Sequence, residues 1–174
     1  DERVNEFFRS EDVRNEYYMI YMTDISVGKD LAEKIDRSYA DMFMLMDHHK
    51  SAEWLNKYGW ADVREFDNVE DYKTSGTWMF YQFLKDLYPK TPCLGALARL
   101  SALVRSYDTW QWKEIGLDKP MHLNMLFFQK GRDKFIEDIL DNIAQSGGDI
   151  FSKRDKLMIE FQLERKEKYI KYAM

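Results

Sequence analysis

The chain has 174 residues, of which 45% are hydrophobic and 33% are charged. This length fits about one domain, and the composition is typical of a soluble globular protein and excludes a disordered one. The formal net charge of −5 argues against nucleic-acid binding through bulk positive charge, although a local basic groove is compatible with it.

The sequence also carries signals about its cellular setting. It has no run of about 18 apolar residues, so we expect no membrane span. Its single cysteine, Cys93, cannot form an internal disulfide, and this indicates a reducing, cytoplasmic location. The first residue is Asp1, with neither an initiator methionine nor a signal peptide, so we expect the chain to begin inside a longer reading frame.

The first quarter of the chain predicts a strand–helix–strand unit. After a short amphipathic helix at residues 2–9, the β-prone run at residues 17–22 predicts a buried strand. Residues 29–39 form an amphipathic pattern typical of a helix. A second apolar run, residues 43–46, predicts another buried strand, and a helical crossover of this length makes the two strands parallel.

Polar side chains follow both predicted strands. Asp24 comes just after the first strand, and Asp47, His48 and His49 end the second, with two of the three histidines in the chain. Because the carboxyl ends of parallel strands meet at one edge of a sheet, we expect these groups to converge there. Carboxylates and imidazoles together are suitable metal ligands. A buried structural histidine beside a surface one is the alternative interpretation of the His-His pair.

Two predicted helix starts are candidate anion sites, since free backbone N–H groups cluster at such starts. The first is at Lys50, where a helix over residues 50–58 follows His49. The second is the run Thr74 to Thr77, which opens a strongly apolar helix to residue 88 after a possible strand at residues 60–66. More often such a run only caps its helix.

The second half of the sequence is helix-rich. Its apolar patterns predict four helices, at residues 94–107, 120–128, 133–145 and 153–172. Residues 65–71 read as an acidic loop, and residues 146–149 as a linker. We therefore predict an α/β fold with a short parallel sheet flanked by helices, a core domain over residues 1–148, and a linker with a long connecting helix over residues 149–174.

Four short motifs together resemble the DHH phosphoesterase family, which includes RecJ-like single-strand exonucleases, nano-RNases, cyclic-dinucleotide phosphodiesterases and manganese pyrophosphatases. The resemblance covers nearly the whole chain, and the Asp-His-His triplet at a strand end is its most specific part. The motifs are Thr23-Asp24-Ile25-Ser26, Asp47-His48-His49-Lys50, Ser75-Gly76-Thr77 and Tyr107-Asp108-Thr109-Trp110.

The resemblance implies a role for each of these residues around two Mn²⁺ or Mg²⁺ ions. Asp24 matches the aspartate that bridges the two metals, His48 matches a ligand of one of them, and Asp108 matches the aspartate that completes its shell. Asp47 resembles the acid that orients an imidazole, and His49 resembles the group that contacts the substrate phosphate. Residues implied at the substrate phosphate are His49, Lys50, Ser75, Gly76 and Thr77.

The sequence also departs from the family pattern. Residues 1–23 contain no histidine and lack the family's first motif, a His and two Asp on the first strand. The smaller C-terminal substrate-binding domain of the family does not follow the long helix. We therefore expect the chain to be the middle of a longer family member.

Three functional hypotheses follow. The first is a metal-dependent phosphodiesterase that acts on short single-stranded nucleic acid or small nucleotides. The second is a catalytically incomplete module that binds nucleotide or metal. The third is a purely structural α/β domain in which Trp110, Trp112 and Phe80 fill a core. The choice among RNA, DNA, cyclic dinucleotides and pyrophosphate, the cleavage direction and the oligomeric state are left open by the sequence.

Overall fold

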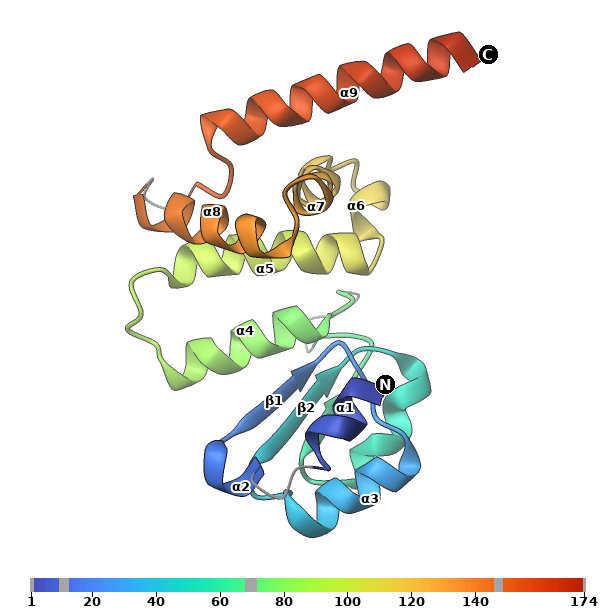
Figure 1. Cartoon of the computed structure of the whole chain (residues 1–174), viewed down its shortest axis with the longest axis vertical. Helices are drawn as coiled ribbons and strands as arrows, with labels where there is room; N and C mark the ends of the chain where they lie inside the picture. Colours follow the sequence, from blue (N-terminus) through green and yellow to red (C-terminus); the bar gives the residue numbers. More distant parts are fainter. Residues whose placement is uncertain (1, 10–12, 68–71, 146–148, 174) are drawn as a thin grey trace. The chain divides into compact units, whose positions relative to one another are not determined.

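A computed structural model describes residues 2–9, 13–67, 72–145 and 149–173 (Figure 1). The chain divides into two compact units, Asp1–Gln82 and Phe83–Met174. The predicted acidic loop at residues 65–71 lies partly outside the described residues, and the predicted linker at residues 146–149 lies mostly outside them. The expected division into a core and a connecting helix stays a prediction.

The first unit is built on a three-stranded parallel sheet with the strand order β1-β2-β3. The strands are β1 (Ile20–Thr23), β2 (Phe43–Asp47) and β3 (Ala61–Val63). Thr23 lies opposite Met46 in β2, so β1 and β2 end at the same edge. The predicted α/β class and the parallel pairing of the first two strands are confirmed.

Helices connect and cover these strands. The predicted helix after His49 is present, as a 3₁₀ helix, and the four-residue α2 was not predicted because it is too short to show a helical period. The helices that lie in or begin in this unit are α1 (Glu2–Phe7), α2 (Val13–Glu16), α3 (Lys29–Ser38), η1 (Lys50–Lys57) and α4 (Gly76–Leu87).

Alternation along the strands divides side chains between the two faces of the sheet. Phe43 and Leu45 of β2 are buried in one apolar cluster with Leu31 and Ile35 of α3. On β1, Tyr21 points to the opposite face, where its ring lies 5.3 Å from that of Phe80 in α4. The sheet is therefore covered on both faces, as parallel sheets require, and its polar groups concentrate at the strand ends.

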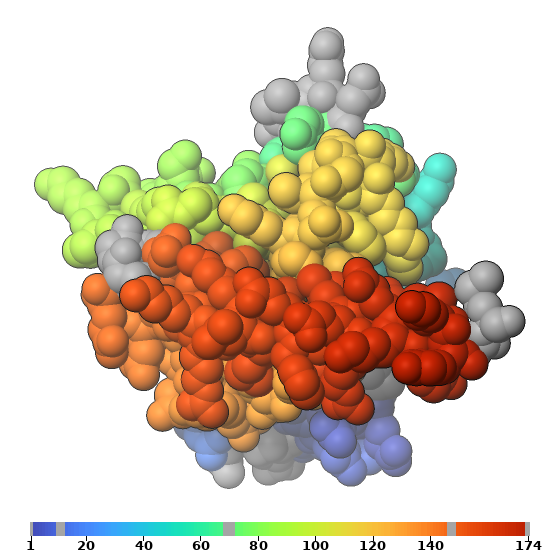
Figure 2. Space-filling model, turned by 90° about the horizontal axis from the view of Figure 1, so that it is seen from above, coloured from blue at the N-terminus to red at the C-terminus, as the bar shows by residue number. Residues whose placement is uncertain are grey.

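The second unit is helical. Its core contains the buried residues Leu123, Ile139 and Ile150. Helix α7 packs against α5, α8 and α9, so it is the central helix of the unit. The elements are α5 (Leu94–Asp108), α6 (Gln111–Glu114), α7 (Lys119–Lys130), α8 (Arg132–Gln145) and α9 (Lys153–Ala173), and α9 is the red helix that crosses the face seen in Figure 2.

Two expectations about this half can be compared with the structure. Among the described residues, no helix combines the length and the apolar character needed to cross a membrane. The structural hypothesis placed Trp110 in a core, and this is wrong, because 59% of the Trp110 side chain is exposed.

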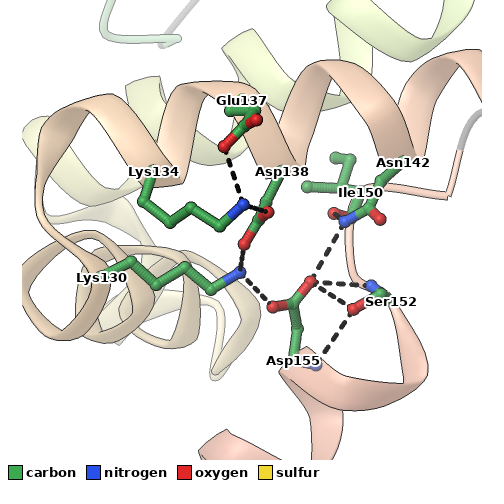
Figure 3. A network of polar contacts seen from close by, with 8 residues as sticks. All are labelled: Lys130, Lys134, Glu137, Asp138, Asn142, Ile150, Ser152 and Asp155. Carbon is green, nitrogen blue, oxygen red and sulfur yellow. Dashed lines mark hydrogen bonds and ion pairs between the residues drawn. The ribbon is translucent and has the colours of Figure 1, made fainter.

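A buried polar network connects three helices of this unit (Figure 3). The Lys130 ammonium, at the end of α7, donates to Asp138 on α8 at 2.7 Å and to Asp155 on α9. Asp155 also accepts the backbone N–H of Ser152 at 2.9 Å and its hydroxyl at 2.8 Å, and the amide of Asn142 at 3.1 Å. Because Asp155 is 1% exposed, these bonds replace the water that its carboxylate loses on folding.

The network shifts the pKa of its charged groups. Burial alone would raise the pKa of Asp155, but hydrogen bonds from Lys130 and Ser152 outweigh burial and lower it. The pKa of Asp138 is lowered by its hydrogen bonds to Lys130 and Lys134. Both carboxylates therefore stabilise the fold above their unfolded-state pKa of about 3.9, and this stabilisation is lost as the pH falls through the lower folded values.

We predict that Asp155→Asn lowers the free energy of unfolding by about 2–4 kcal/mol at pH 7, because it leaves a buried ammonium with one carboxylate fewer. The loss should shrink toward pH 3, where the wild-type protein gives up the same interaction. Urea unfolding followed by circular dichroism at both pH values measures it. The control is Asp133→Asn, whose exposed carboxylate pairs with Arg132 and should leave stability unchanged. Equal effects of the two substitutions would contradict the prediction.

Candidate metal and phosphate site

The ends of β1 and β2 place Asp24 and Asp47 side by side at one edge of the sheet. The backbone N–H of Asp24 donates to the carbonyl of Met46 at 3.1 Å, one bond beyond the end of β1. Asp24 has a φ of 57°, in the left-handed region that residues with a Cβ seldom adopt. The chain thus leaves β1 through a strained turn, and such strain is often found at functional sites.

Asp24 and His48 come close enough to share a cation. The Nε2 atom of His48 lies 3.7 Å from Oδ1 of Asp24. This distance is too long for a hydrogen bond, but two ligands that are each about 2.1 Å from one ion can lie up to roughly 4.2 Å apart. Both side chains are largely shielded, with 13% of His48 and 28% of Asp24 exposed.

The carboxylate of Asp47 holds the two histidines in position. Its side chain is fully buried, and Oδ1 accepts the backbone N–H of His48 at 2.7 Å and that of His49 at 3.3 Å. The same oxygen lies 2.7 Å from Nδ1 of the His49 imidazole, which is 55% exposed. This is the geometry that an acid orienting an imidazole requires.

The other oxygen of Asp47 indicates that the site accepts a further group. Oδ2 is buried and has no hydrogen-bond partner among the described residues. A buried carboxylate oxygen without a partner is costly and calls for an ion or an ordered water. The ligand atoms of Asp47, His48 and His49 lie within 4.8 Å of one another, so these residues fit a divalent cation.

The start of α4 already binds an anion, which is the carboxylate of Asp24. The N–H of Gly76 donates to Oδ1 at 2.5 Å, and the N–H of Thr77 donates to Oδ2 at 3.0 Å. The Thr77 hydroxyl donates the third hydrogen bond to this carboxylate, also to Oδ2, at 2.9 Å. Ser75 instead caps the helix, since its Oγ accepts the N–H of Trp78 at 3.2 Å. Phosphate binding by Ser75, Gly76 and Thr77 stays a prediction.

Gly76 permits this contact because it has no side chain. A Cβ at this position would lie 2.5 Å from the backbone nitrogen of Asp24 and 2.7 Å from both Asp24 Oδ1 and the carbonyl oxygen of Met46. Two of these atoms belong to the backbone at the strand ends and cannot move without moving the strands. Gly76 is therefore required wherever α4 meets the turn at Asp24.

The remaining predicted residues are Lys50 and Asp108. Lys50 is the first residue of η1, directly after the histidine pair, and its side chain is exposed. Asp108 is the last residue of α5 in the second unit, and its side chain is also exposed. The metal-binding role of Asp108 and the phosphate-binding role of Lys50 stay predictions.

The parallel sheet with carboxylates and imidazoles at one edge is the arrangement expected from the DHH phosphoesterase resemblance, and comparison with known proteins confirms the resemblance as distant homology. The chain is a distant homologue of the DHH-family protein oligoribonuclease NrnB of Bacillus subtilis (strain 168), with 27% identity over 172 residues. The match covers 97% of this chain and 42% of that protein, so the chain spans less than half of the length of this relative. No family model matches the chain, and no solved structure matches it.

We predict that Gly76→Ala destabilises the first unit by about 1–3 kcal/mol, because the new methyl group collides with backbone at the ends of β1 and β2. It should also weaken Mn²⁺ binding at least about tenfold, since Asp24 must shift. Thermal unfolding and isothermal titration calorimetry measure the two effects. Gly59→Ala is the matched control, because nothing lies within 4 Å of its added Cβ. An unchanged Mn²⁺ affinity in the folded Gly76→Ala protein would contradict the contact.

Proposed function

We propose that this chain carries the active site of a metal-dependent phosphodiesterase that acts on short single-stranded nucleic acid or small nucleotides. The observation that carries the proposal is the pair formed by His48 and Asp24, 3.7 Å apart at the edge of a parallel sheet. The distant relationship to an oligoribonuclease supports it.

The proposed ligands are Asp24, His48 and Asp108 for one ion, with Asp24 shared by a second. Hard carboxylate oxygens combined with imidazole suit Mn²⁺ or Mg²⁺ better than a thiolate-rich zinc site would. When bound, two such metal ions supply hydroxide at neutral pH and neutralise charge on the phosphate oxygens. The buried Oδ2 atom of Asp47 supports a cation in this region, because it lacks a protein partner among the described residues.

The side chains of the protein would then hold and orient the phosphate. The Nδ1 atom of His49 lies 2.7 Å from Oδ1 of the buried Asp47 carboxylate, and this contact fixes the orientation of the ring. With both ring nitrogens protonated, the His49 imidazolium would donate through Nε2 to a phosphate oxygen and stabilise the negative charge that develops in the transition state. Lys50, exposed directly after His49 in the sequence, would add positive charge for the phosphate.

The second candidate is a module that binds metal or nucleotide without turnover. Residues 1–23 contain no histidine, so the chain offers only part of the ligand set that two metals need. The two candidates differ in one measurable respect: only the first cleaves the nucleotide that it binds.

We predict that the chain hydrolyses a short oligoribonucleotide in the presence of Mn²⁺. His48→Ala should reduce this rate by at least about 100-fold, because it removes a metal ligand. Chromatography of the released mononucleotides measures the rate. His122→Ala, the third histidine, on α7 of the second unit, is the matched control and should retain full activity.

Three outcomes decide between the candidates. Hydrolysis that depends on His48 supports the phosphodiesterase. Saturable Mn²⁺ binding without any hydrolysis supports the binding module and contradicts catalysis by this chain. Hydrolysis that is unchanged in His48→Ala contradicts the proposed site.

A further inference from the structure

Trp110 is a large aromatic residue that is exposed to solvent and has a strained backbone conformation. Its φ is 63°, in the left-handed region, where a bulky residue is a genuine outlier. Its side chain is 59% exposed, so the strain is not compensated by burial of the indole. Figure 2 shows the yellow segment that contains the end of α5 and α6 at the molecular surface of the second unit. A strained and exposed tryptophan is a reason to ask what it binds.

The turn that presents Trp110 is firmly built. The N–H of Trp110 donates to the carbonyl of Tyr107 at 3.1 Å, and its own carbonyl accepts the N–H of Lys113 at 3.1 Å. The neighbouring Thr109 is buried, and its hydroxyl donates to the carbonyl of Arg105 at 2.8 Å. These bonds fix the backbone of the turn from which the indole extends.

Three aromatic rings form what we call the aromatic ledge, which consists of Tyr107, Trp110 and Trp112. The Tyr107 ring lies nearly parallel to that of Trp112, at 6.0 Å and 9°, and to that of Trp110, at 6.5 Å and 22°. Asn124 of α7 donates to the Tyr107 hydroxyl at 2.7 Å and fixes the ring against rotation. Tyr107 and Trp112 are half-buried and Trp110 is the exposed ring of the ledge, so Trp110 is the surface that a flat ligand can reach.

A positive charge lies over the ledge. The ammonium of Lys113 is above the Trp110 ring, 4.2 Å from its centre, and 5.5 Å from the centre of the Trp112 ring, so a base that stacks on this face of Trp110 would take the place of the ammonium. An aromatic surface next to a cation is the combination that binds single-stranded nucleic acid, because the base stacks on the ring while the cation meets the phosphate.

We propose that the aromatic ledge binds a nucleobase of the nucleotide substrate, stacked on Trp110, with Lys113 facing the attached phosphate. In the sequence, Trp110 follows Asp108, one of the proposed metal ligands, by two residues. The inference rests on the proposed function and adds to it a site that recognises the base rather than the phosphate. Stacking is sequence-tolerant, so the ledge fits purines and pyrimidines alike.

The test measures base binding without catalysis. A dinucleotide that contains the fluorescent base 2-aminopurine is titrated with the full chain in EDTA, and stacking is detected as quenching of the base. Trp110→Ala should weaken binding by about 5- to 150-fold, the usual effect of removing one stacked aromatic side chain. Trp110→Phe keeps a ring and should stay within about threefold of wild type.

A matched control and a second ligand keep the test decisive. Phe128→Ala removes another exposed aromatic side chain of the same unit, 76% exposed, and should leave quenching unchanged. Ribose 5-phosphate, which has no base, should compete at least about fivefold more weakly than adenosine monophosphate for the wild-type chain. This comparison needs no variant and holds even where Trp110→Ala fails to fold.

The ledge is overturned if the wild-type chain shows no saturable quenching at millimolar dinucleotide, if Trp110→Ala binds as tightly as wild type, or if ribose 5-phosphate competes equally. An equal loss in Phe128→Ala also overturns it and indicates a general apolar surface for a protein partner. These failures differ from a failure of the proposed function: hydrolysis that requires His48 but not Trp110 removes only the ledge, and base binding without hydrolysis removes only catalysis.

Discussion

The candidate site depends on the hydrogen bonds that the N-terminus of α4 donates to the Asp24 carboxylate. Two backbone amides and a hydroxyl, from Gly76 and Thr77, bind this carboxylate. The contact requires a left-handed turn at Asp24 and the absence of a side chain at Gly76. Together these features tie the end of β1 to a helix that begins 52 residues later, and they set the carboxylate beside His48.

These hydrogen bonds are compatible with metal binding by Asp24 and favour it. An ionised carboxylate offers about four lone-pair positions, so the three bonds from α4 leave one for the cation that His48 would share, and a second cation at Asp24 would have to replace one of these bonds. Because Asp24 is already held in place, little side-chain entropy remains to be lost when an ion binds. His49 likewise has little side-chain entropy to lose, because its Nδ1 atom contacts the buried Asp47 carboxylate.

Much of the first unit could be predicted because its signals are local. The apolar runs that become β1 and β2 are short and bounded, and the helix between them makes the strands parallel, so the meeting of Asp24 with the histidine pair follows from topology. The partner of Asp24 could not be predicted, because the run at Gly76 and Thr77 indicates a candidate anion site or a helix cap, but no local signal identifies the Asp24 carboxylate as the anion. The exposure of Trp110 could not be predicted for a related reason: the period of an apolar pattern does not reveal a left-handed turn, and the four-residue α6 is too short to show a period at all.

The central claim is that Asp24 and His48 hold one divalent ion, and the most direct test is anomalous diffraction from crystals of the chain grown with Mn²⁺. The account predicts an anomalous peak within about 2.3 Å of both Asp24 Oδ1 and His48 Nε2. A Mn²⁺ peak elsewhere, or none at these side chains when the crystal is saturated with the ion, would contradict it.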